Sequence, residues 1–418
     1  MTPIYSAGIW LYRQGVRAAA LSSKKAAALD AGLGRTFSIL EHNINPGHRY
    51  IWIHAASLGE FEQGRPLIEM IRREHPELKI VLTFFSPSGY EVRKNYDGAD
   101  IIVYLPFDTP RNVTRFLDIV RPIFAVFVKY EFWGNYLEQL HRRNIPTYLI
   151  SAVFRPEQLF FKPYGGLYRS LLHYFTHIYV QDARSLRLLG DIGIDNVAVA
   201  GDTRFDRVSD IMRRVHPIPE LERFCGGTRS AERDHTIFMA GSSWPADENV
   251  YADWLRRHRE VKGVIAPHEF DHQRLEEMKR IFGPDETVLL SEIRNGDSDI
   301  TGKRILIIDC FGLLSSAYRY ADFVYVGGGF GAGLHNINEA AVYGVPVLFG
   351  PNHSKFIEAE EMKTLGGGIA VHSREGFERN ADRLLYDRKE REQRGRWAAE
   401  YIQSKLGATT LIYNSLPL

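Results

Sequence analysis

The sequence predicts an α/β protein made of two doubly wound domains, each a parallel sheet covered by helices on both faces. Short apolar runs rich in β-branched and aromatic residues alternate with helical stretches along the whole chain, which is the order typical of parallel sheets. With 418 residues, the chain exceeds the length at which a single hydrophobic core usually stops growing. Two prolines and two glycines gather in residues 215–228 and indicate a linker. We therefore expect domains at 1–212 and 213–418.

The strands follow one another in the same manner in both halves of the chain. In the first half, apolar runs predict strands at 50–54, 79–84, 101–105, 123–128, 147–150, 177–180 and 196–200. In the second half they predict strands at 235–240, 261–266, 287–290, 304–308, 323–326 and 346–349. Helical patterns separate them, as at 271–281, and a last helix is expected from about residue 390.

Composition excludes several classes of protein. The hydrophobic share of 44% and the charged share of 25% are those of an ordered globular protein. A net charge of +1 gives no general attraction to nucleic acid. Cys225 and Cys310 are the two cysteines of the sequence, so neither a disulfide framework nor a cysteine zinc site is expected.

The N-terminal segment leaves two interpretations open. No apolar run reaches the roughly 20 residues that a membrane-spanning helix needs. However, Tyr5, Trp10, Leu11 and Tyr12 are followed by Arg13 and by further basic residues. Such a helix can lie in a membrane interface with its cations on anionic lipid, or it can simply dock on its own domain.

Residues 326–356, VGGGFGAGLHNINEAAVYGVPVLFGPNHSKF, read as a buried strand, a glycine loop, a helix and a second strand. Glycines such as Gly329 allow the backbone to approach a ligand closely, and a helix opening near Asn336 would offer free N–H groups to an anion. Glu339, in the first turns of that helix, could accept hydrogen bonds from a sugar hydroxyl. The alternative is a structural glycine turn before a packed helix.

The segment HAASLGEFEQGRPLI follows the first strand and supplies a candidate base. Ser57 and Gly59 form a turn, and Glu60 enters the start of a helix. A carboxylate in a dry cleft can take a proton from a hydroxyl, because burial raises its pKa to a useful value. The alternative is that Glu60 is a first-turn acid that only caps the helix.

Four further polar clusters follow predicted strands. KYEFWGN contains Lys129 and Glu131, GDTRFDR contains Arg204, GSSWPADE begins at Gly241, and PHEFDHQRL contains His268. Each cluster alone could be structural. The last cluster invites a metal interpretation, but its spacing matches no HExxH-type site. We therefore expect no metal site.

Taken together, these motifs resemble the 3-deoxy-D-manno-octulosonic acid (Kdo) transferases of lipopolysaccharide synthesis, nearly from end to end. The family pattern H-x-x-S-x-G-E matches the turn from His54 to Glu60, E-x-E-L-W-P-N matches KYEFWGN, and G-x-x-K-F-D matches GDTRFD. In the second half, G-S-T-H-E-G-E is similar to GSSWPAD. The pattern G-G-H-N-P-L-E, followed by G-K-P-V-L-x-G-P, is similar to GLHNINE followed by GVPVLFGP.

The resemblance implies a GT-B fold, with two Rossmann-like domains facing an interdomain cleft. It implies an inverting, metal-independent and cofactor-free transfer of Kdo from CMP-Kdo to a lipid A precursor resembling lipid IVA. The enzyme would be peripheral, on the cytoplasmic face of the inner membrane, with its N-terminal helix facing the membrane surface. The first domain would bind the acceptor, the second the donor, and the last helix would pack back on the first domain. No nucleic acid partner is expected.

By the same resemblance, site residues fall into three groups. Glu60 and Glu131 are the catalytic candidates. Donor-binding candidates are Ser242, Ser243, His268, Gly329, Asn336, Asn338 and Glu339. Acceptor-binding candidates are Ser57, Gly59, Lys129 and Arg204.

The sequence also departs from the family pattern. Lys129 stands where an acidic residue is usual, Trp244 replaces a histidine, and Arg204 replaces a lysine. PHEFDHQRL lacks the arginine of the family pattern, which leaves His268 or Arg274 to meet an anion. Three rival functions stay open: a GT-B transferase or epimerase that uses a UDP-linked sugar, a Rossmann-type oxidoreductase, and a membrane-surface binding protein without catalysis.

Overall fold

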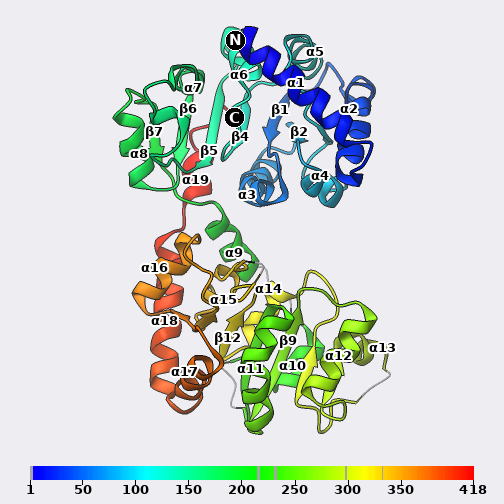
Figure 1. Cartoon of the computed structure of the whole chain (residues 1–418), viewed down its shortest axis with the longest axis vertical. Coiled ribbons are helices and arrows are strands. Elements are labelled where there is room, and N and C mark those ends of the chain that lie inside the picture. The colour runs from blue at the N-terminus through cyan, green and yellow to red at the C-terminus, as the bar shows by residue number, and fades with distance from the viewer. Residues whose placement is uncertain (1–2, 214–216, 230–232, 297–298, 332) are drawn as a thin grey trace. The chain divides into compact units, whose positions relative to one another are not determined.

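The computed structural model describes residues 3–213, 217–229, 233–296, 299–331 and 333–418 (Figure 1). The chain forms two compact units, each described here by itself. The first unit contains the residues up to Asp206 together with Leu406–Leu418, and the second contains Arg207–Lys405. The division therefore falls within helix α9 (Arg204–Arg213).

The first unit is built on one seven-stranded sheet in the order β3-β2-β1-β4-β5-β6-β7. Every neighbouring pair is parallel. The strands are β1 (Tyr50–His54), β2 (Lys79–Phe84), β3 (Ile101–Tyr104), β4 (Ala125–Val128), β5 (Thr147–Ala152), β6 (His177–Val180) and β7 (Val197–Val199). All seven strands predicted for this half are confirmed.

Helices cover both faces of this sheet because every strand is apolar on both sides. Trp52 of β1 belongs to one hydrophobic core, whereas Ile51 and Ile53 belong to a second core, as expected when side chains alternate between the two faces of a strand. The helices are α1 (Pro3–Ala19), α2 (Lys24–Asn43), α3 (Leu58–Glu74), α4 (Pro87–Arg93), α5 (Pro110–Val120), α6 (Gly134–Arg142), η1 (Leu159–Phe161), α7 (Gly166–Leu172), α8 (Ala183–Gly190) and α19 (Ala408–Tyr413).

The second unit repeats the plan with a parallel seven-stranded sheet in the order β10-β11-β9-β8-β12-β13-β14. Its strands are β8 (Thr236–Ser243), β9 (Val261–Pro267), β10 (Thr287–Leu289), β11 (Ile305–Ile307), β12 (Phe323–Val326), β13 (Val347–Phe349) and β14 (Gly368–Ala370). Six of these strands are predicted by the sequence. The seventh, β14, lacks an apolar run because it is three residues long and follows two glycines.

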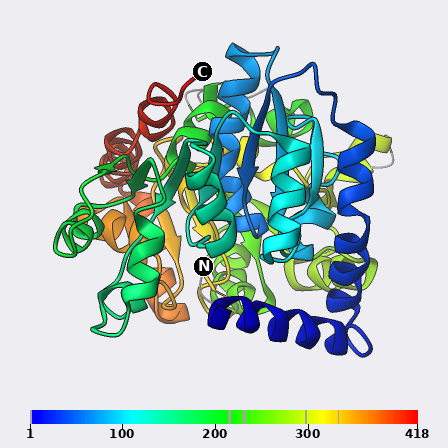
Figure 2. The same ribbon diagram turned by 90° about the horizontal axis from the view of Figure 1, so that it is seen from above.

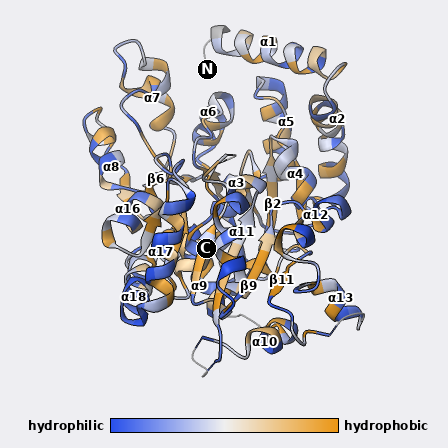
Figure 3. Ribbon diagram, turned by 60° about the horizontal axis from the view of Figure 1, so that its bottom comes forward, coloured by the Kyte–Doolittle hydropathy of each residue, from blue (hydrophilic) through white to orange (hydrophobic). Residues whose placement is uncertain are grey.

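The helices of the second unit are α10 (Pro219–Cys225), α11 (Pro245–Arg257), α12 (His272–Phe282), α13 (Leu290–Asn295), α14 (Leu314–Ala317), η2 (Tyr318–Tyr320), α15 (Asn338–Ala341), α16 (Ile357–Leu365), α17 (Arg374–Tyr386) and α18 (Arg388–Ser404). Figure 3 shows strands such as β9 and β11 as hydrophobic ribbons, whereas α18 is largely hydrophilic. The strands therefore form the core, and helices shield it from water.

Helix α1 docks on its own unit and still exposes apolar side chains. The Tyr5 hydroxyl donates to Asp108 Oδ2 at 2.6 Å and accepts from the Gly134 N–H at 2.9 Å, while Trp10 and Leu11 are 55% and 63% exposed. Figure 2 shows α1 and α2, in dark blue, meeting at a sharp corner. Within the described residues, no helix is both long and apolar enough to cross a membrane.

The C-terminal segment is held on the first unit by one carboxylate. Asp206 accepts hydrogen bonds from the Gly407 N–H at 2.7 Å and from the Thr409 N–H at 2.6 Å, so it satisfies the first N–H groups of α19. Ile412 and Leu416 then complete a core of this unit. Asp206, within the GDTRFD motif, therefore fixes the end of the chain.

We predict that Asp206→Ala lowers stability by about 1 kcal/mol, the usual effect of losing a helix cap. Urea unfolding checks the loss, and limited trypsin digestion should cut faster at Lys405, which precedes the released segment. Asp210→Asn is the matched control, because Asp210 lies one turn further along α9 and makes only an exposed ion pair with Arg213 at 4.0 Å. Equal effects of the two changes would contradict the prediction.

Candidate functional site

The predicted site residues of the first unit converge where β1 and β4 end. These strands are parallel neighbours, with His54 opposite Phe127, so the residues that follow them emerge at the same edge of the sheet. Ser57, Gly59 and Glu60 follow β1, and Lys129 and Glu131 follow β4. The parallel pairing thus brings together five residues from two motifs that are separated by some seventy positions of sequence.

A capping box holds Glu60 in place. Ser57 is the N-cap of α3, where its Oγ accepts from the Glu60 N–H at 3.4 Å. In return, Glu60 Oε2 accepts from the Ser57 N–H at 3.0 Å. Reciprocal bonds of this kind satisfy two N–H groups of the first helical turn. The structure therefore gives Glu60 a capping role, with Oε2 bound to the backbone.

The environment of Glu60 also suits a base. Burial is the largest cause that raises the pKa of Glu60, and the nearby charge of Glu131 raises it further. His54, the bond from Ser57 and Lys129 act in the opposite direction. The raised pKa brings the carboxylate closer to the range in which general bases work at neutral pH. Capping and proton transfer are compatible, since the capping bond uses one of the two carboxylate oxygens.

Glu131 is oriented by a chain of buried polar groups. The Trp52 indole donates to Thr83 Oγ1 at 2.9 Å, and that hydroxyl lies 2.9 Å from His54 Nδ1. His54 Nε2 lies 3.1 Å from Glu131 Oε2. His54 Nδ1 also lies 3.2 Å from the Thr83 carbonyl oxygen, and the Trp133 indole N–H lies 3.1 Å from Nε2. The buried imidazole is therefore held from both sides, with Nε2 against Glu131.

A second polar group completes the orientation of Glu131. The Trp133 indole N–H lies 2.5 Å from Glu131 Oε2. Neither Trp133 nor His54 is among the candidate site residues predicted from the sequence. His54 is fully buried, and as the last residue of β1 it stands where a strand delivers side chains to the site.

Lys129 has an unusual backbone conformation, and Arg204 is held by an ion pair. Lys129 has a φ of +69°, a left-handed conformation that costs energy for a residue with a Cβ and is common at functional sites. Arg204 is bound to the buried Asp202, with Nε and Nη2 at 2.8 and 2.6 Å from Oδ2. Asp202 Oδ2 also accepts from Gln63 of α3 at 3.3 Å. Arg204 is thus tied to the helix that carries Glu60.

A largely aromatic pocket of about 540 Å³ adjoins Glu131. Its lining residues come from α1, from the loop after β4 and from the segment around η1: Tyr5, Tyr130, Glu131, Phe132, Trp133, Glu157, Gln158, Leu159, Phe160 and Tyr168. Leu159 and Tyr168 are 40% and 39% exposed. The pocket is large enough for part of an apolar ligand.

In the second unit, the helix expected near Asn336 is present but short. It is α15, which spans four residues from Asn338 to Ala341 and contains Glu339 in its first turn. The role of its N-terminus in binding an anion stays a prediction. Gly329 packs against Gly350, and a Cβ on Gly329 would lie 2.6 Å from the Gly350 nitrogen. At this position glycine is required for backbone packing.

Asp247 is the buried residue that fixes this loop. Its Oδ2 accepts from the Gly328 N–H at 2.8 Å and from the Trp244 N–H at 3.0 Å, and its Oδ1 accepts from the Tyr325 hydroxyl at 2.7 Å. The carboxylate is fully buried. It joins the end of β8, strand β12 and the glycine loop, although the sequence analysis notes Asp247 only as part of a motif.

Trp244, His268 and His335 form an aromatic stack at the same edge. The rings of Trp244 and His268 lie 4.2 Å apart and nearly parallel, and those of His268 and His335 lie 4.7 Å apart. The Trp244 indole donates to His335 Nε2 at 3.1 Å. Burial, aided by His268, lowers the pKa of His335. A neutral His335 then carries its proton on Nδ1, which can donate to a ligand.

The side chains of Asn336 and Glu339 are joined by a hydrogen bond, whereas the side chain of Asn338 makes none among the described residues. Asn336 Nδ2 donates to Glu339 Oε1 at 3.1 Å, and the Ser315 hydroxyl donates to Glu339 Oε2 at 2.5 Å. The Asn338 side chain is fully buried, and its amide oxygen and nitrogen have no hydrogen-bond partner among the described residues. Orphaned buried amides are rare.

The remaining candidates for binding the sugar donor differ in their burial and in their contacts with other protein groups. Ser243 is buried, with its hydroxyl 2.6 Å from that of Tyr251, whereas Ser242 has a φ of +50° and is half-buried. Arg274 is ion-paired with the buried Glu248 and with Glu277, so it is committed to protein carboxylates. Within the described part of the chain, no three His, Cys, Asp or Glu side chains gather as a metal site.

Comparison with known proteins connects this geometry to a family. Residues 30–207 match the family model described as 3-deoxy-D-manno-octulosonic-acid transferase (kdotransferase). The chain is 25% identical over 387 residues to the 3-deoxy-D-manno-octulosonic acid transferase of Haemophilus influenzae, covering 87% of this chain and 85% of that protein. It is also 25% identical over 349 residues to the Aquifex aeolicus transferase, covering 81% and 87%. The predicted resemblance to Kdo transferases is confirmed by this family model and by relatives that match most of the chain.

The protein is a glycosyltransferase with a GT-B fold. The UDP-GlcNAc 2-epimerase of Neisseria meningitidis, bound to UDP-GlcNAc, has a TM-score of 0.60 to it at 15% identity, covering 87% of this chain and 98% of that chain. At that identity the likeness concerns the fold alone. The predicted family and fold class are confirmed, while the roles of individual site residues and the predicted interdomain cleft stay predictions.

We predict that Asp247→Ala destabilises this glycosyltransferase by about 3 kcal/mol, because three donors lose their acceptor at once. Tyr325→Phe is the matched smaller change, since it removes one of these hydrogen bonds and should cost about 1 kcal/mol. Urea unfolding followed by tryptophan fluorescence measures both. Equal losses in the two variants would show that Asp247 does not hold the glycine loop.

Proposed function

We propose that this enzyme transfers Kdo from CMP-Kdo to a lipid A precursor resembling lipid IVA, as a step of lipopolysaccharide core synthesis. The observation that carries the proposal is the pair of carboxylates, Glu60 and Glu131, at the ends of β1 and β4 in a chain that resembles the Kdo transferases. The curated relatives of similar length are named as transferases of this sugar.

Glu60 is the proposed base. The acceptor hydroxyl gives its proton to Glu60, its oxygen bonds to the anomeric carbon of Kdo, and the bond from that carbon to the phosphate oxygen breaks as CMP leaves. A single displacement inverts the anomeric centre. Glu60 Oε2 stays on the Ser57 N–H, so Oε1 takes the proton. The bond to Ser57 keeps the carboxylate from rotating away.

Glu131 acts on the same proton transfer. Burial is the main cause that raises the pKa of Glu60, and the charge of Glu131 is the second. His54 and Trp133 fix the position of Glu131. We propose that Glu131 tunes the base and orients the acceptor sugar, with Ser57, Gly59, Lys129 and Arg204 at the acceptor side. The two cations suit the phosphate groups of a lipid A precursor.

The second unit is the proposed donor site. Glu339, held by Ser315 and Asn336, would accept hydrogen bonds from the cytidine ribose. Ser242, Ser243, His268, Gly329 and the unsatisfied amide of Asn338 would bind the phosphate and the Kdo carboxylate. In this proposal neutral donors meet the charge of the departing CMP, without a bound metal ion or cofactor.

A lipid acceptor fits the apolar features of the first unit. The 540 Å³ pocket beside Glu131 contains Tyr5 of α1 and aromatic residues of the η1 segment. Trp10 and Leu11 of α1 point to solvent, where they can enter the headgroup region of a bilayer. We propose that the enzyme is peripheral on the cytoplasmic face of the inner membrane, where an acylated acceptor resides.

We predict that Glu60→Gln lowers kcat about 10²–10⁴-fold, the usual contribution of a general base. Glutamine also serves at this position of a capping box, so the fold and CMP-Kdo binding should persist. The measurement is a transfer assay with CMP-Kdo generated in situ and a tetraacylated lipid A precursor, read by the mass of the product.

Glu69→Gln is the control for the transfer assay. It lies on the same helix as Glu60 and pairs with Arg65 at 2.6 Å on the protein surface, so its activity should stay within a factor of two. Normal transfer by Glu60→Gln would remove that residue from the mechanism. No mass gain with the native enzyme, beside an active control transferase, would overturn the proposed substrates.

We predict that the activity of the native enzyme falls as pH drops through the raised pKa of Glu60, because a protonated carboxyl cannot act as a base. In Glu131→Gln the repulsion from a second carboxylate is gone, so the pKa of Glu60 falls and the acid limb of kcat/KM moves to lower pH. A pH profile of both enzymes checks this. A limb that stays in place would show that Glu131 does not tune Glu60.

A further inference from the structure

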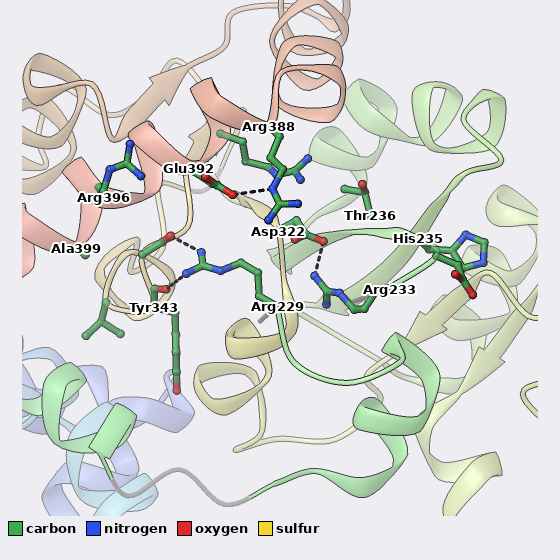
Figure 4. Close-up of a pocket in the computed structure, with 14 residues that line it drawn as sticks. Arg229, Arg233, His235, Thr236, Asp322, Tyr343, Arg388, Glu392, Arg396 and Ala399 are labelled. Carbon is green, nitrogen blue, oxygen red and sulfur yellow. Dashed lines mark hydrogen bonds and ion pairs between the residues drawn. The ribbon is translucent and has the colours of Figure 1, made fainter. Parts of the chain in front are cut away.

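The second unit has a cavity of about 1010 Å³ at the edge of its sheet opposite to the proposed donor site (Figure 4). Its lining includes Thr236, the first residue of β8, and Asp322, which directly precedes β12. The donor candidates Ser242 and Ser243 lie at the other end of β8. At about 3.3 Å per residue, the two ends of that strand are about 23 Å apart. The cavity is therefore separate from the site described above.

Arginine dominates the charge of this cavity. Among the residues that the structure describes, five arginines line it against three carboxylates, an excess of two positive charges before His235 is counted. Two arginines have carboxylate partners: Arg233 forms a buried ion pair with Asp322 at 2.6 Å, and Arg388 pairs with Glu392 at 2.7 Å. The close-up shows these pairs on two sides of Arg229.

The other three arginines, Arg229, Arg391 and Arg396, have no carboxylate partner among the described residues. Arg229 donates to the carbonyl oxygens of Tyr343 and Gly344. Arg396 Nη2 lies 2.5 Å from the neutral Gln393 Oε1. Neither contact offsets the charge of the guanidinium.

The hydrogen bonds that Arg391 makes within the protein do not use all of its N–H donors. Its Nη1 donates at 2.8 and 3.3 Å to the carbonyls of Leu384 and Leu385 in the last turn of α17. These bonds explain a helix-capping role, but they use only Nη1 of a group that carries five N–H donors. Burial is the main cause that lowers the pKa of both Arg229 and Arg391; the charges of Asp322 and Glu392 raise it, and neighbouring arginines lower it. A bound anion would add to the attraction of the two carboxylates and offset the repulsion between the arginines.

We propose that the arginine cavity is a binding site for a ligand that carries two or more phosphate groups. Guanidinium groups bind phosphate oxygens in a bidentate manner, and the excess of two positive charges matches a multiply charged anion. The volume lies at the upper end of the range for small-molecule sites, so it holds more than a single inorganic phosphate. The phosphates come from a soluble polyphosphate compound or from lipid headgroups.

Isothermal titration calorimetry with inorganic pyrophosphate at fixed ionic strength tests the site on the full chain. The test variant is Arg388→Glu with Arg396→Glu, two exposed positions whose loss leaves the buried pair of Arg233 intact. We expect affinity to fall at least tenfold. The matched control is Arg256→Glu with Arg280→Glu, the same change of charge on exposed arginines outside the cavity, and its affinity should stay within twofold.

Two further experiments test where pyrophosphate binds and whether the natural ligand is a soluble compound or a lipid headgroup. Glu339→Ala alters the proposed donor site and should leave pyrophosphate affinity unchanged, whatever it does to transfer. Flotation with phosphatidylglycerol vesicles, against phosphatidylcholine vesicles, asks whether the arginine pair is also needed for membrane binding. Dependence on the pair for pyrophosphate alone identifies a soluble ligand, and dependence for anionic vesicles identifies headgroups. The proposal is overturned if neither probe depends on the pair, or if the control pair weakens binding equally.

Discussion

The hydrogen bond from the Ser57 N–H to Glu60 is the constraint on which the proposed catalytic site depends. It fixes a carboxylate at the first turn of α3, directly beyond the end of β1. Parallel pairing of β1 with β4 then places Glu131 beside it. Two acids close together, one of them buried, push the proton affinity of Glu60 upward. The helix cap, which stabilises the fold, thus also holds the proposed base in position, while burial and Glu131 raise its pKa.

The second unit reaches its geometry by a different means. There a buried carboxylate, Asp247, accepts three hydrogen bonds and draws the end of β8, strand β12 and the glycine loop together. The glycines make this approach possible, because a Cβ on Gly327 would lie 2.3 Å from the Ser242 carbonyl oxygen. A loop held so tightly on its own protein presents few mobile N–H groups. Side chains that follow it, such as Glu339 and Asn338, are then the groups available for recognition.

Local patterns in the sequence predict most strands because these strands bury both faces and are therefore continuously apolar, whereas the edge strand β7 is only partly buried. Because the strands can be located, the sequence also predicts that Glu60 and Glu131 follow strands of the first sheet and that Glu339 follows a strand of the second. Local patterns fail where partners are distant in sequence. His54 meets Glu131 across 77 positions, and Asp247 meets Gly328 across 81. The helix expected near Asn336 is present as the four-residue α15, and the packing of the preceding glycines on Gly350 and Asp247 is a tertiary feature that no periodicity reveals.

The structure shows what surrounds the residues that depart from the family pattern in the second unit. Arg274 could have replaced the absent arginine, but the buried Glu248 already engages it, and releasing it would leave an unpaired charge in the protein. His335 is held neutral by burial, with Nε2 occupied by Trp244. In the proposed donor site, the neutral His335 would offer a phosphate an uncharged donor, its Nδ1–H. Arg207 adds a positive charge near Glu339, with burial lowering its pKa and Glu339 raising it. Geometry and charge would therefore both contribute to recognition at this edge.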